Sequence, residues 1–210
     1  MRTILLISIL LLFPCLPILL HRTTFASESS HAAEKHLLAF FGSGGHTAEM
    51  MSLLNALNST LYPVRTYVTG RDDKMSQKKA KVLMSQQADL RTQLLSVPRA
   101  RYVKQSWLTT PFTAFISLFG ALRVIFMNEF GTPDVLLCNG PGTCVLICFS
   151  AMLARLLGKP IKIVYVESFA RVRSLSLSGK ILMPFVDRFL VQFPELVEKY
   201  KKAEYIGIVA

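Results

Sequence analysis

The chain has 210 residues, a length that suits one domain with a short appendage and excludes two full domains. Hydrophobic residues make up 51% of it and charged residues 18%, which excludes a disordered chain. Its 24 Lys and Arg against 13 Asp and Glu give a net charge of +11. This surplus indicates an anionic partner such as nucleic acid, an acidic lipid surface or a phosphorylated substrate.

Residues 1–22 have the composition of a membrane anchor. Between residues 3 and 20 there is no charged residue, and thirteen of these positions are Leu, Ile or Phe. The run reaches the minimal length of a transmembrane helix, so we expect residues 1–22 to span a membrane and the polar residues 23–35 to form a linker. The alternative is a cleaved signal peptide, for which small residues around Ala26 would supply the cleavage site.

The cysteines and the charge of the body favour the cytosolic side of that membrane. Three of the four cysteines lie in the apolar stretch 138–148, which is typical of buried reduced thiols. A basic body would be attracted to an anionic leaflet, although the charges that flank the leader do not settle its orientation. On this placement, we expect the glycosylation sequon Asn58-Ser59-Thr60 to remain unmodified.

From residue 36 onward, apolar runs typical of buried strands alternate with stretches of helical periodicity. In chain order, we expect a strand at 36–41, a helix at 47–58, a strand at 64–69, a helix at 74–87, a strand at 94–97, a helix at 111–127, a strand at 135–138, a helix at 143–157, strands at 161–166 and 188–192, and a helix at 195–201. This alternation predicts an α/β fold: a Rossmann-like open parallel sheet with right-handed crossovers, forming one domain over residues 36–210 and preceded by one transmembrane helix.

Residues 108–127 are apolar except for Arg123 and allow three interpretations. They could form a second membrane span, an ordinary core helix, or a helix that rests in a lipid interface beside the basic residues that precede it. Pro111, Gly120 and Arg123 disfavour a span, so we expect a core helix with an exposed apolar side.

A glycine-rich turn follows the first expected strand and opens the first expected helix. It contains the candidate phosphate-binding residues Gly42, Ser43, Gly44, Gly45 and Thr47. Such a turn lets backbone N–H groups and a helix N-terminus approach a phosphate, although a plain tight turn with a threonine cap is the simpler alternative.

The same turn only partly fits a dinucleotide-binding fingerprint. Gly42 and Gly44 match the pattern, but Thr47 stands where the third glycine belongs. Asp72 and Asp73 lie further along the chain than the usual ribose-binding acid. A dinucleotide-dependent membrane oxidoreductase is therefore a weaker alternative.

A second glycine turn connects a strand to a helix at Asn139, Gly140, Gly142 and Thr143. In an open parallel sheet, turns that follow the strands share the carboxyl edge, so the two glycine turns are expected to line one crevice and to bind phosphate together. The alternative is a helix cap at Thr143 with no ligand.

Two residues at the same edge are candidates for acid–base catalysis. His46 opens the first helix and could meet an anionic ligand or act as a general base, and Glu167 ends the strand 161–166. The alternatives are a solvent-facing helix start for His46 and a surface acid paired with Arg171 or Arg173 for Glu167. Because no His or Cys cluster has zinc-ligand spacing and no RNA-binding aromatic pattern is present, we expect no metal, no cofactor and no nucleic-acid partner.

Several segments together resemble one known family. They are residues 41–50, 97–101, 105–107, 133–145, 164–168 and 175–180. The most specific are Asn-Gly-Pro-Gly-Thr-Cys from Asn139 and Tyr-Val-Glu-Ser from Tyr165. The chain from about residue 37 to its end is similar to the membrane-anchored subunit of the two-chain UDP-N-acetylglucosamine transferase of the dolichol-linked oligosaccharide pathway, the asparagine-linked glycosylation subunit fourteen family.

This resemblance implies the amino-terminal half of a GT-B glycosyltransferase, with the donor-binding half on a separate soluble chain. The anchored subunit would recruit that chain to the cytosolic face of the endoplasmic reticulum membrane, and the nuclear envelope would be a second location. Together the chains would add the second N-acetylglucosamine, β1,4-linked and with inversion, from UDP-GlcNAc to dolichyl-diphosphate-GlcNAc. The subunit is not expected to be active alone, and a recruiter without catalytic groups is the alternative.

The resemblance also gives roles to individual residues. The two glycine turns would border the acceptor diphosphate, and His46 or Glu167 would take the proton from the acceptor 4-hydroxyl. The tail resembles the segment of the family that docks on the partner chain, whereas a closing strand of the domain is the alternative. The candidate docking residues are Tyr205, Ile206, Gly207, Ile208 and Val209.

Overall fold

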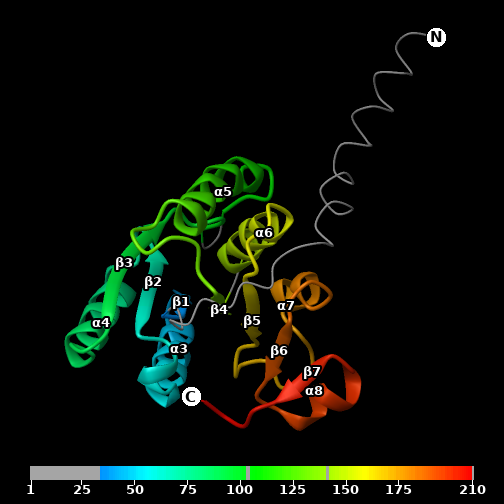
Figure 1. Cartoon of the computed structure of the whole chain (residues 1–210). Coiled ribbons are helices and arrows are strands. Elements are labelled where there is room, and N and C mark those ends of the chain that lie inside the picture. Colours follow the sequence, from blue (N-terminus) through cyan, green and yellow to red (C-terminus); the bar gives the residue numbers. More distant parts are fainter. Residues whose placement is uncertain (1–33, 103–104, 141, 210) are drawn as a thin grey trace, which may run out of the picture. The chain divides into compact units, whose positions relative to one another are not determined.

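The body is built on a seven-stranded sheet in which every neighbouring pair of strands is parallel (Figure 1). The computed structural model describes residues 34–102, 105–140 and 142–209. The strands are β1 (His36–Phe41), β2 (Val64–Gly70), β3 (Arg91–Val97), β4 (Val135–Asn139), β5 (Lys162–Val166), β6 (Arg188–Val191) and β7 (Ala203–Tyr205). Their order across the sheet is β3-β2-β1-β4-β5-β6-β7, which confirms the prediction of a Rossmann-like parallel sheet.

Helices connect these strands as the alternation predicted. They are α3 (Gly45–Ala56), the short 3-10 helix η1 (Ser59–Leu61), α4 (Lys74–Gln86), α5 (Thr110–Phe126), α6 (Thr143–Leu156), α7 (Leu177–Leu182) and α8 (Pro194–Lys199). The six-residue α7 was not expected from the sequence, and β7 forms in the tail for which a closing strand was the alternative.

The anchor predicted for residues 1–22 and most of the linker predicted for residues 23–35 lie outside the described residues. Within the part of the chain that the structure describes, no helix is both long and apolar enough to cross a membrane.

The sheet separates two hydrophobic cores because all six residues of β1 are buried and alternate side chains point to opposite faces. Leu38 and Phe40 join one core with α5 and α6. Leu37, Ala39 and Phe41 join the other core with α3 and α4. Each fully buried Leu or Phe contributes about 1.5–3 kcal/mol to folding, so this strand stabilises both halves of the fold.

The strand order reverses between β1 and β4, and this point positions the candidate site. Phe41 pairs with Asn139 in the register, so both strands end side by side at the carboxyl edge. The chain then leaves β1 into α3 on one face and leaves β4 into α6 on the other (Figure 1). A switch point of this kind is where open α/β sheets bind ligands.

Helix α5 has one face in the core and one apolar face exposed, as expected for residues 108–127. Its buried positions are Ser117, Ala121, Val124 and Ile125. The Ser117 hydroxyl donates a 2.7 Å hydrogen bond to the carbonyl of Pro98, which ties the helix to the end of β3. The opposite face carries three phenylalanines with exposed fractions of 70%, 59% and 58%, at Phe112, Phe115 and Phe119.

Candidate functional site

The two glycine turns meet at the switch point, and the contact requires glycine at both positions. A Cβ atom on Gly42 would stand 2.7 Å from the Cβ of His46 and 3.0 Å from the carbonyl oxygen of Asn139. A Cβ atom on Gly140 would stand 3.4 Å from the Cα of Gly42. Gly140 also has a φ of +128°, which side chains other than glycine rarely tolerate. The predicted convergence of the two turns is therefore present.

The first turn presents the amino terminus of α3 to solvent. Gly44 adopts a φ of +66° and directly precedes the helix. No side chain within the described part of the chain caps this helix start, and Gly44 and Gly45 are exposed while Ser43 is half-buried. Backbone N–H groups at an uncapped helix start, together with the helix dipole, favour an anion.

The hydroxyls of the two candidate threonines contact the protein itself. The Thr47 hydroxyl donates to the carbonyl of Gly42 and lies 2.6 Å from the hydroxyl of Ser76. The Thr143 hydroxyl accepts a 3.1 Å hydrogen bond from the backbone N–H of Ala100. These contacts hold the shapes of the turns, so the backbone of the turns is the part that remains available to a phosphate.

His46 is half-buried and contacts the second glycine turn directly. Its Nδ1 atom lies 2.6 Å from the Oδ1 atom of Asn139. The Asn139 side chain is fully buried, and its Nδ2 group donates a 2.7 Å hydrogen bond to the Oε2 atom of Glu49. A chain of hydrogen bonds therefore runs from the half-buried imidazole into the protein.

Glu49 is a functional candidate that sequence reasoning missed. It is 1% exposed and accepts hydrogen bonds from the Ser168 hydroxyl at 3.1 Å and from the Gln192 side-chain amide at 3.0 Å. The signal in the sequence was its spacing: His46 and Glu49 lie three residues apart, which places both on one face of α3.

Glu167 is buried and all of its side-chain contacts lie within the protein. It is 1% exposed, so it is not the surface acid paired with Arg171 or Arg173 that was the alternative. Its Oε1 atom accepts the N–H of Ser168 at 3.0 Å, and its Oε2 atom accepts the N–H and hydroxyl of Ser176 at 2.9 and 3.0 Å. Because Ser176 caps α7, this carboxylate fixes the start of that helix.

The buried side chain of Tyr165 also holds the second turn in place. The Tyr165 hydroxyl donates a 3.2 Å hydrogen bond to the carbonyl of Gly140, and burial raises the pKa of Tyr165 so that it remains a donor.

Burial likewise raises the pKa of the Cys138 thiol well above its ordinary value, and Cys144 and Cys148 are also buried and free. The expectation of buried reduced thiols is confirmed for these three residues.

Both acids considered for a ribose contact already have partners. Asp72 accepts a 3.0 Å hydrogen bond from the Tyr102 hydroxyl. The Asp73 side chain caps α4 by accepting a 3.0 Å hydrogen bond from the N–H of Ser76 and forms a 3.2 Å ion pair with Arg99. Within the described residues, no group of three or more His, Cys, Asp or Glu side chains has the geometry to hold a metal ion.

The tail combines a closing strand with exposed apolar side chains. Tyr205 ends β7 and pairs with Val191 of β6, and the N–H of Ile206 donates to the Val191 carbonyl at 3.0 Å. Gly207 turns the chain with a φ of +81°. The side chains of Tyr205 and Ile208 are 54% and 65% exposed.

The last described residue of the tail reaches the candidate site through its backbone. The N–H of Val209 donates a 2.8 Å hydrogen bond to the Gln192 side chain, which is the same side chain that donates to Glu49. The tail is therefore connected to the buried carboxylate through one intervening residue.

Two solved structures have a similar fold. MurG from Acinetobacter baumannii matches with a TM-score of 0.54 and 18% identity, covering 76% of this chain and 42% of that chain. A UDP-N-acetylglucosamine 2-epimerase matches with a TM-score of 0.53 and 13% identity, covering 81% of this chain and 45% of that chain. At such identities the likeness shows the fold alone, and this chain spans less than half of either protein.

Sequence comparison identifies the family. Residues 37–209 match the family described as "Oligosaccharide biosynthesis protein Alg14 like". A relative from Schizosaccharomyces pombe, named UDP-N-acetylglucosamine transferase subunit alg14, is 62% identical over 210 residues and covers all of both chains. The mouse relative of the same name is 47% identical over 180 residues, or 81% of each chain. These matches, together with the parallel sheet and its paired glycine turns, show that the chain belongs to the Alg14 family.

Proposed function

We propose that this chain is the membrane-anchoring, acceptor-binding subunit of a two-chain N-acetylglucosaminyltransferase. The relatives are named subunits of a UDP-N-acetylglucosamine transferase, which supports a partner chain and a UDP-GlcNAc donor. The partner would be a soluble donor-binding subunit that this chain recruits to the cytosolic face of the endoplasmic reticulum. Together they would add the second GlcNAc, β1,4-linked, to dolichyl-diphosphate-GlcNAc in protein N-glycosylation.

One observation carries the proposal: a half-buried histidine sits between two glycine turns at the switch point of the sheet. The acceptor diphosphate would bind at the turns, where the N–H groups and dipole of α3 offset its charge. Residues of both turns contribute to this binding site. They are Gly42, Ser43, Gly44, Gly45, Thr47, Asn139, Gly140, Gly142 and Thr143.

The proposed reaction is a single displacement with His46 as the general base. His46 Nε2 accepts the proton of the acceptor 4-hydroxyl as its oxygen bonds to the anomeric carbon of the donor, and the bond from that carbon to UDP breaks on the opposite face. The product is inverted, UDP leaves as the anion, and the proton remains on the imidazole until solvent removes it. We favour His46 over Glu167 because His46 is only half-buried, whereas Glu167 is 1% exposed and both of its oxygens accept internal hydrogen bonds.

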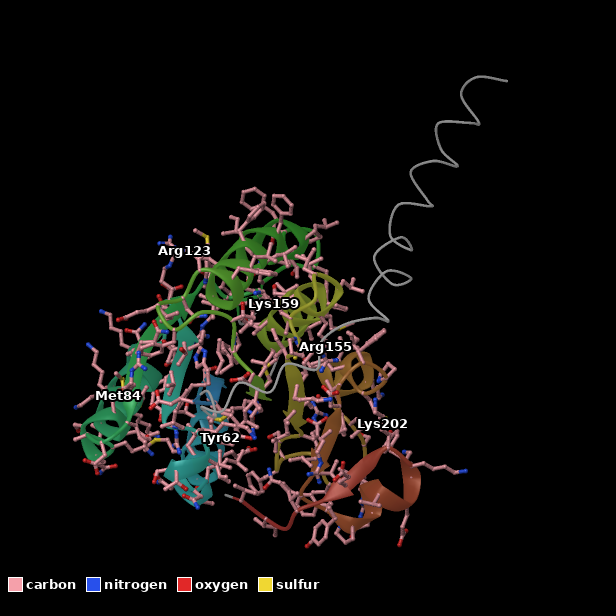
Figure 2. All side chains as sticks on the ribbon, viewed as in Figure 1. Tyr62, Met84, Arg123, Arg155, Lys159 and Lys202 are labelled. Carbon is pink, nitrogen blue, oxygen red and sulfur yellow. The ribbon has the colours of Figure 1, made fainter. Side chains whose placement is uncertain are left out.

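An exposed apolar surface supports contact of the body with a lipid bilayer. Helices α5 and α6 pack against each other, and the surface consists of their outward side chains. These are Phe112, Phe115, Phe119, Leu153 and Leu156. Two exposed basic residues lie at the ends of the same helices, Arg123 in the last turn of α5 and Lys159 three residues after α6 (Figure 2). An apolar face with basic neighbours suits an anionic membrane interface, which is where a dolichol-linked acceptor resides.

The activity is tested by reconstitution. The full chain would be co-expressed with its soluble partner, and membranes would be assayed for transfer of radiolabelled GlcNAc from UDP-GlcNAc to a synthetic polyprenyl-diphosphate-GlcNAc. We expect a β1,4-linked product only when both chains are present. Product formation by the purified chain without a partner would refute the division of labour proposed here.

The cytosolic placement has its own test in the sequon at Asn58. This asparagine lies on the surface, and its Oδ1 atom accepts the N–H and hydroxyl of Thr60 at 3.0 and 2.8 Å. Because the site is exposed, a lumenal body would meet the glycosylation machinery there. We expect endoglycosidase treatment to leave the electrophoretic mass unchanged, and a shift that disappears in Asn58→Gln would place the body in the lumen.

A further inference from the structure

We propose that Glu49 is a positioning residue that acts through Asn139 to fix the tautomer of His46 in which Nε2 is free to accept a proton. The inference deepens the proposed function and rests on it for the identity of the reaction. Its physical basis is the direction of each hydrogen bond in the buried chain from Glu49 to His46.

The direction follows from which groups can donate. A carboxylate only accepts, so the 2.7 Å contact between Asn139 and the Glu49 Oε2 atom must come from the Asn139 amide nitrogen. The amide oxygen of Asn139 then faces His46 Nδ1 at 2.6 Å. An oxygen without hydrogen can only accept, so Nδ1 carries the proton and the lone pair of the neutral ring lies on Nε2.

Glu49 is itself held on several sides. The Ser168 hydroxyl and the Gln192 amide donate to it at 3.1 and 3.0 Å, and the N–H of Phe169 lies 3.4 Å from both oxygens. These contacts come from the segments that follow β5 and β6, whereas Asn139 ends β4. The carboxylate is therefore fixed by three neighbouring strand ends and cannot turn away without breaking several hydrogen bonds.

Backbone groups also fix the orientation of Gln192. Its oxygen accepts the N–H of Val209 at 2.8 Å, and its nitrogen donates to the carbonyl of Glu167 at 3.1 Å. Because a backbone N–H only donates and a carbonyl only accepts, the Gln192 nitrogen must face Glu49. The main chain thus fixes which group donates and which accepts in each hydrogen bond from Gln192 through Glu49 and Asn139 to His46.

The single variant Glu49→Met tests this role, because it keeps an unbranched side chain of similar length and removes both acceptor oxygens. The Asn139 amide then loses its fixed orientation and can turn its own nitrogen toward His46, which places the proton on Nε2. In the assembled enzyme, we expect kcat to fall by about tenfold, because only part of the molecules then keep a general base, with the acceptor KM nearly unchanged. Wild-type kcat in this variant would overturn the inference.

The conservative variant Glu49→Gln separates positioning from folding. The nitrogens of Asn139 and Gln192 both point at the Oε2 position, at 2.7 and 3.0 Å, so the amide oxygen of residue 49 takes that position and the polarity at the ring is kept. We expect kcat to recover by about tenfold over Glu49→Met, while Asn139→Asp alone faces Glu49 with a second carboxylate and stays impaired. The matched control Ser117→Ala removes one buried hydrogen bond outside this network, and we expect its kcat to stay within about threefold of wild type.

The tautomer can be observed without any activity. The full chain would be labelled with ¹⁵N-histidine in detergent micelles, and the His46 resonances would be identified by their loss in His46→Gln. We expect the shifts of a protonated Nδ1 in the wild type and in Glu49→Gln, and a population with a protonated Nε2 in Glu49→Met. An unchanged tautomer in Glu49→Met would overturn the inference.

The two proposals fail in distinguishable ways. If the wild-type pair forms no GlcNAc product, the proposed function is wrong, whereas the tautomer of His46 still reports on Glu49. If the pair is active and Glu49→Met behaves as wild type in both measurements, only the positioning role is wrong. Thermal unfolding and co-purification of the partner identify a variant that is impaired because it fails to fold. In that case the tautomer in Asn139→Leu, which removes the oxygen that accepts from His46 Nδ1, decides the outcome, and a retained Nδ1 proton there would overturn the inference.

Discussion

His46 and Glu167 differ in their exposure to solvent, and this difference separates the roles that the sequence allowed for both. His46 is half-buried beside two exposed glycines, and Glu167 accepts backbone hydrogen bonds from both sides of the turn that leads into α7. The sequence could predict that Gly42, His46 and Asn139 converge, because parallel strands end at one edge. It could not show the role of Glu49, because hydrogen-bond partners 90 residues apart have no local signature.

Substitution of the two candidate bases should have different consequences. In the assembled pair, we expect His46→Ala to reduce turnover about 10²–10⁴-fold while the partner still co-purifies. Glu167→Gln leaves one internal donor without an acceptor, so we expect a loss of about 1–3 kcal/mol in the free energy of unfolding. Steady-state kinetics and chemical denaturation of both variants would check this, and near-normal turnover in His46→Ala would remove it from the mechanism. Normal stability with lost turnover in Glu167→Gln would instead identify Glu167 as the base.

A second titratable residue, His36, should make stability depend on pH. It lies at the start of β1 with 4% exposure, and its Nε2 atom is 2.8 Å from the Thr66 hydroxyl. Burial lowers its pKa from 6.5 to about 4, against the opposing charge of Asp134. Between these values the unfolded chain binds more protons than the folded chain, so stability falls as the pH falls through this window.

We expect the pKa shift of His36 to lower the free energy of unfolding by about 2 kcal/mol between about pH 7 and about pH 5. Urea denaturation of the full chain at both pH values would measure it. His36→Gln serves as the control, because it removes this titration and leaves the others in place. An equal pH dependence in His36→Gln and the wild type would show that His36 does not contribute.

At the scale of elements, the sequence predicted the helices and strands whose apolar pattern extends over many residues. It did not predict the short elements that form only through contacts with other segments. β1, α5 and α6 have apolar patterns that extend over most of their length, and their bounds agree with expectation within about two residues. α7 has six residues and starts because Ser176 caps it against Glu167, a contact that no local pattern reveals. β7 has three residues and exists because β6 offers a free edge.

The exposed apolar side chains of the tail allow a test of partner docking. Deletion of residues 206–210 keeps β7 but removes Ile206 and Ile208, whose side chains are 37% and 65% exposed. We expect the deleted chain to remain folded and to lose the partner in co-purification from membranes. Ile208→Ser, which keeps the main chain and its bond to Gln192, should weaken co-purification without changing thermal stability. Full retention of the partner by the deleted chain would contradict docking through this segment.

The two faces of the sheet are covered by helices that expose different kinds of side chain. The face covered by α3 and α4 carries the exposed lysines of α4, whereas the face covered by α5 and α6 exposes large apolar side chains. The composition indicated both a basic and an apolar character, but their assignment to opposite faces depends on which helices follow which strands. This arrangement gives the body one surface that suits a lipid interface and another that suits water.

Trp107, the only tryptophan in the chain, can report on that lipid contact. It is 67% exposed, precedes α5, and lies 4.1 Å below the guanidinium of Arg101. We expect its fluorescence in the full chain to be quenched by brominated acyl chains in vesicles that contain anionic lipid, and less so in Phe112→Ser/Phe115→Ser/Phe119→Ser. Met75→Ser on α4, which removes an equally exposed apolar side chain from the other face, is the matched control. Equal quenching in all three proteins would contradict lipid contact by this surface.

The central position of β1 has a consequence for biosynthesis. Its neighbour β4 ends at Asn139, so the ribosome must add about 100 residues after Phe41 before the second edge of β1 can be paired. At about 5–20 residues per second, this interval lasts roughly 5–20 s, during which the backbone N–H and C=O groups on one edge of this mostly apolar strand remain unpaired. Nascent chains that stall before β4 would therefore expose an apolar strand with one unpaired edge. We expect cellular quality control to recognise and degrade them.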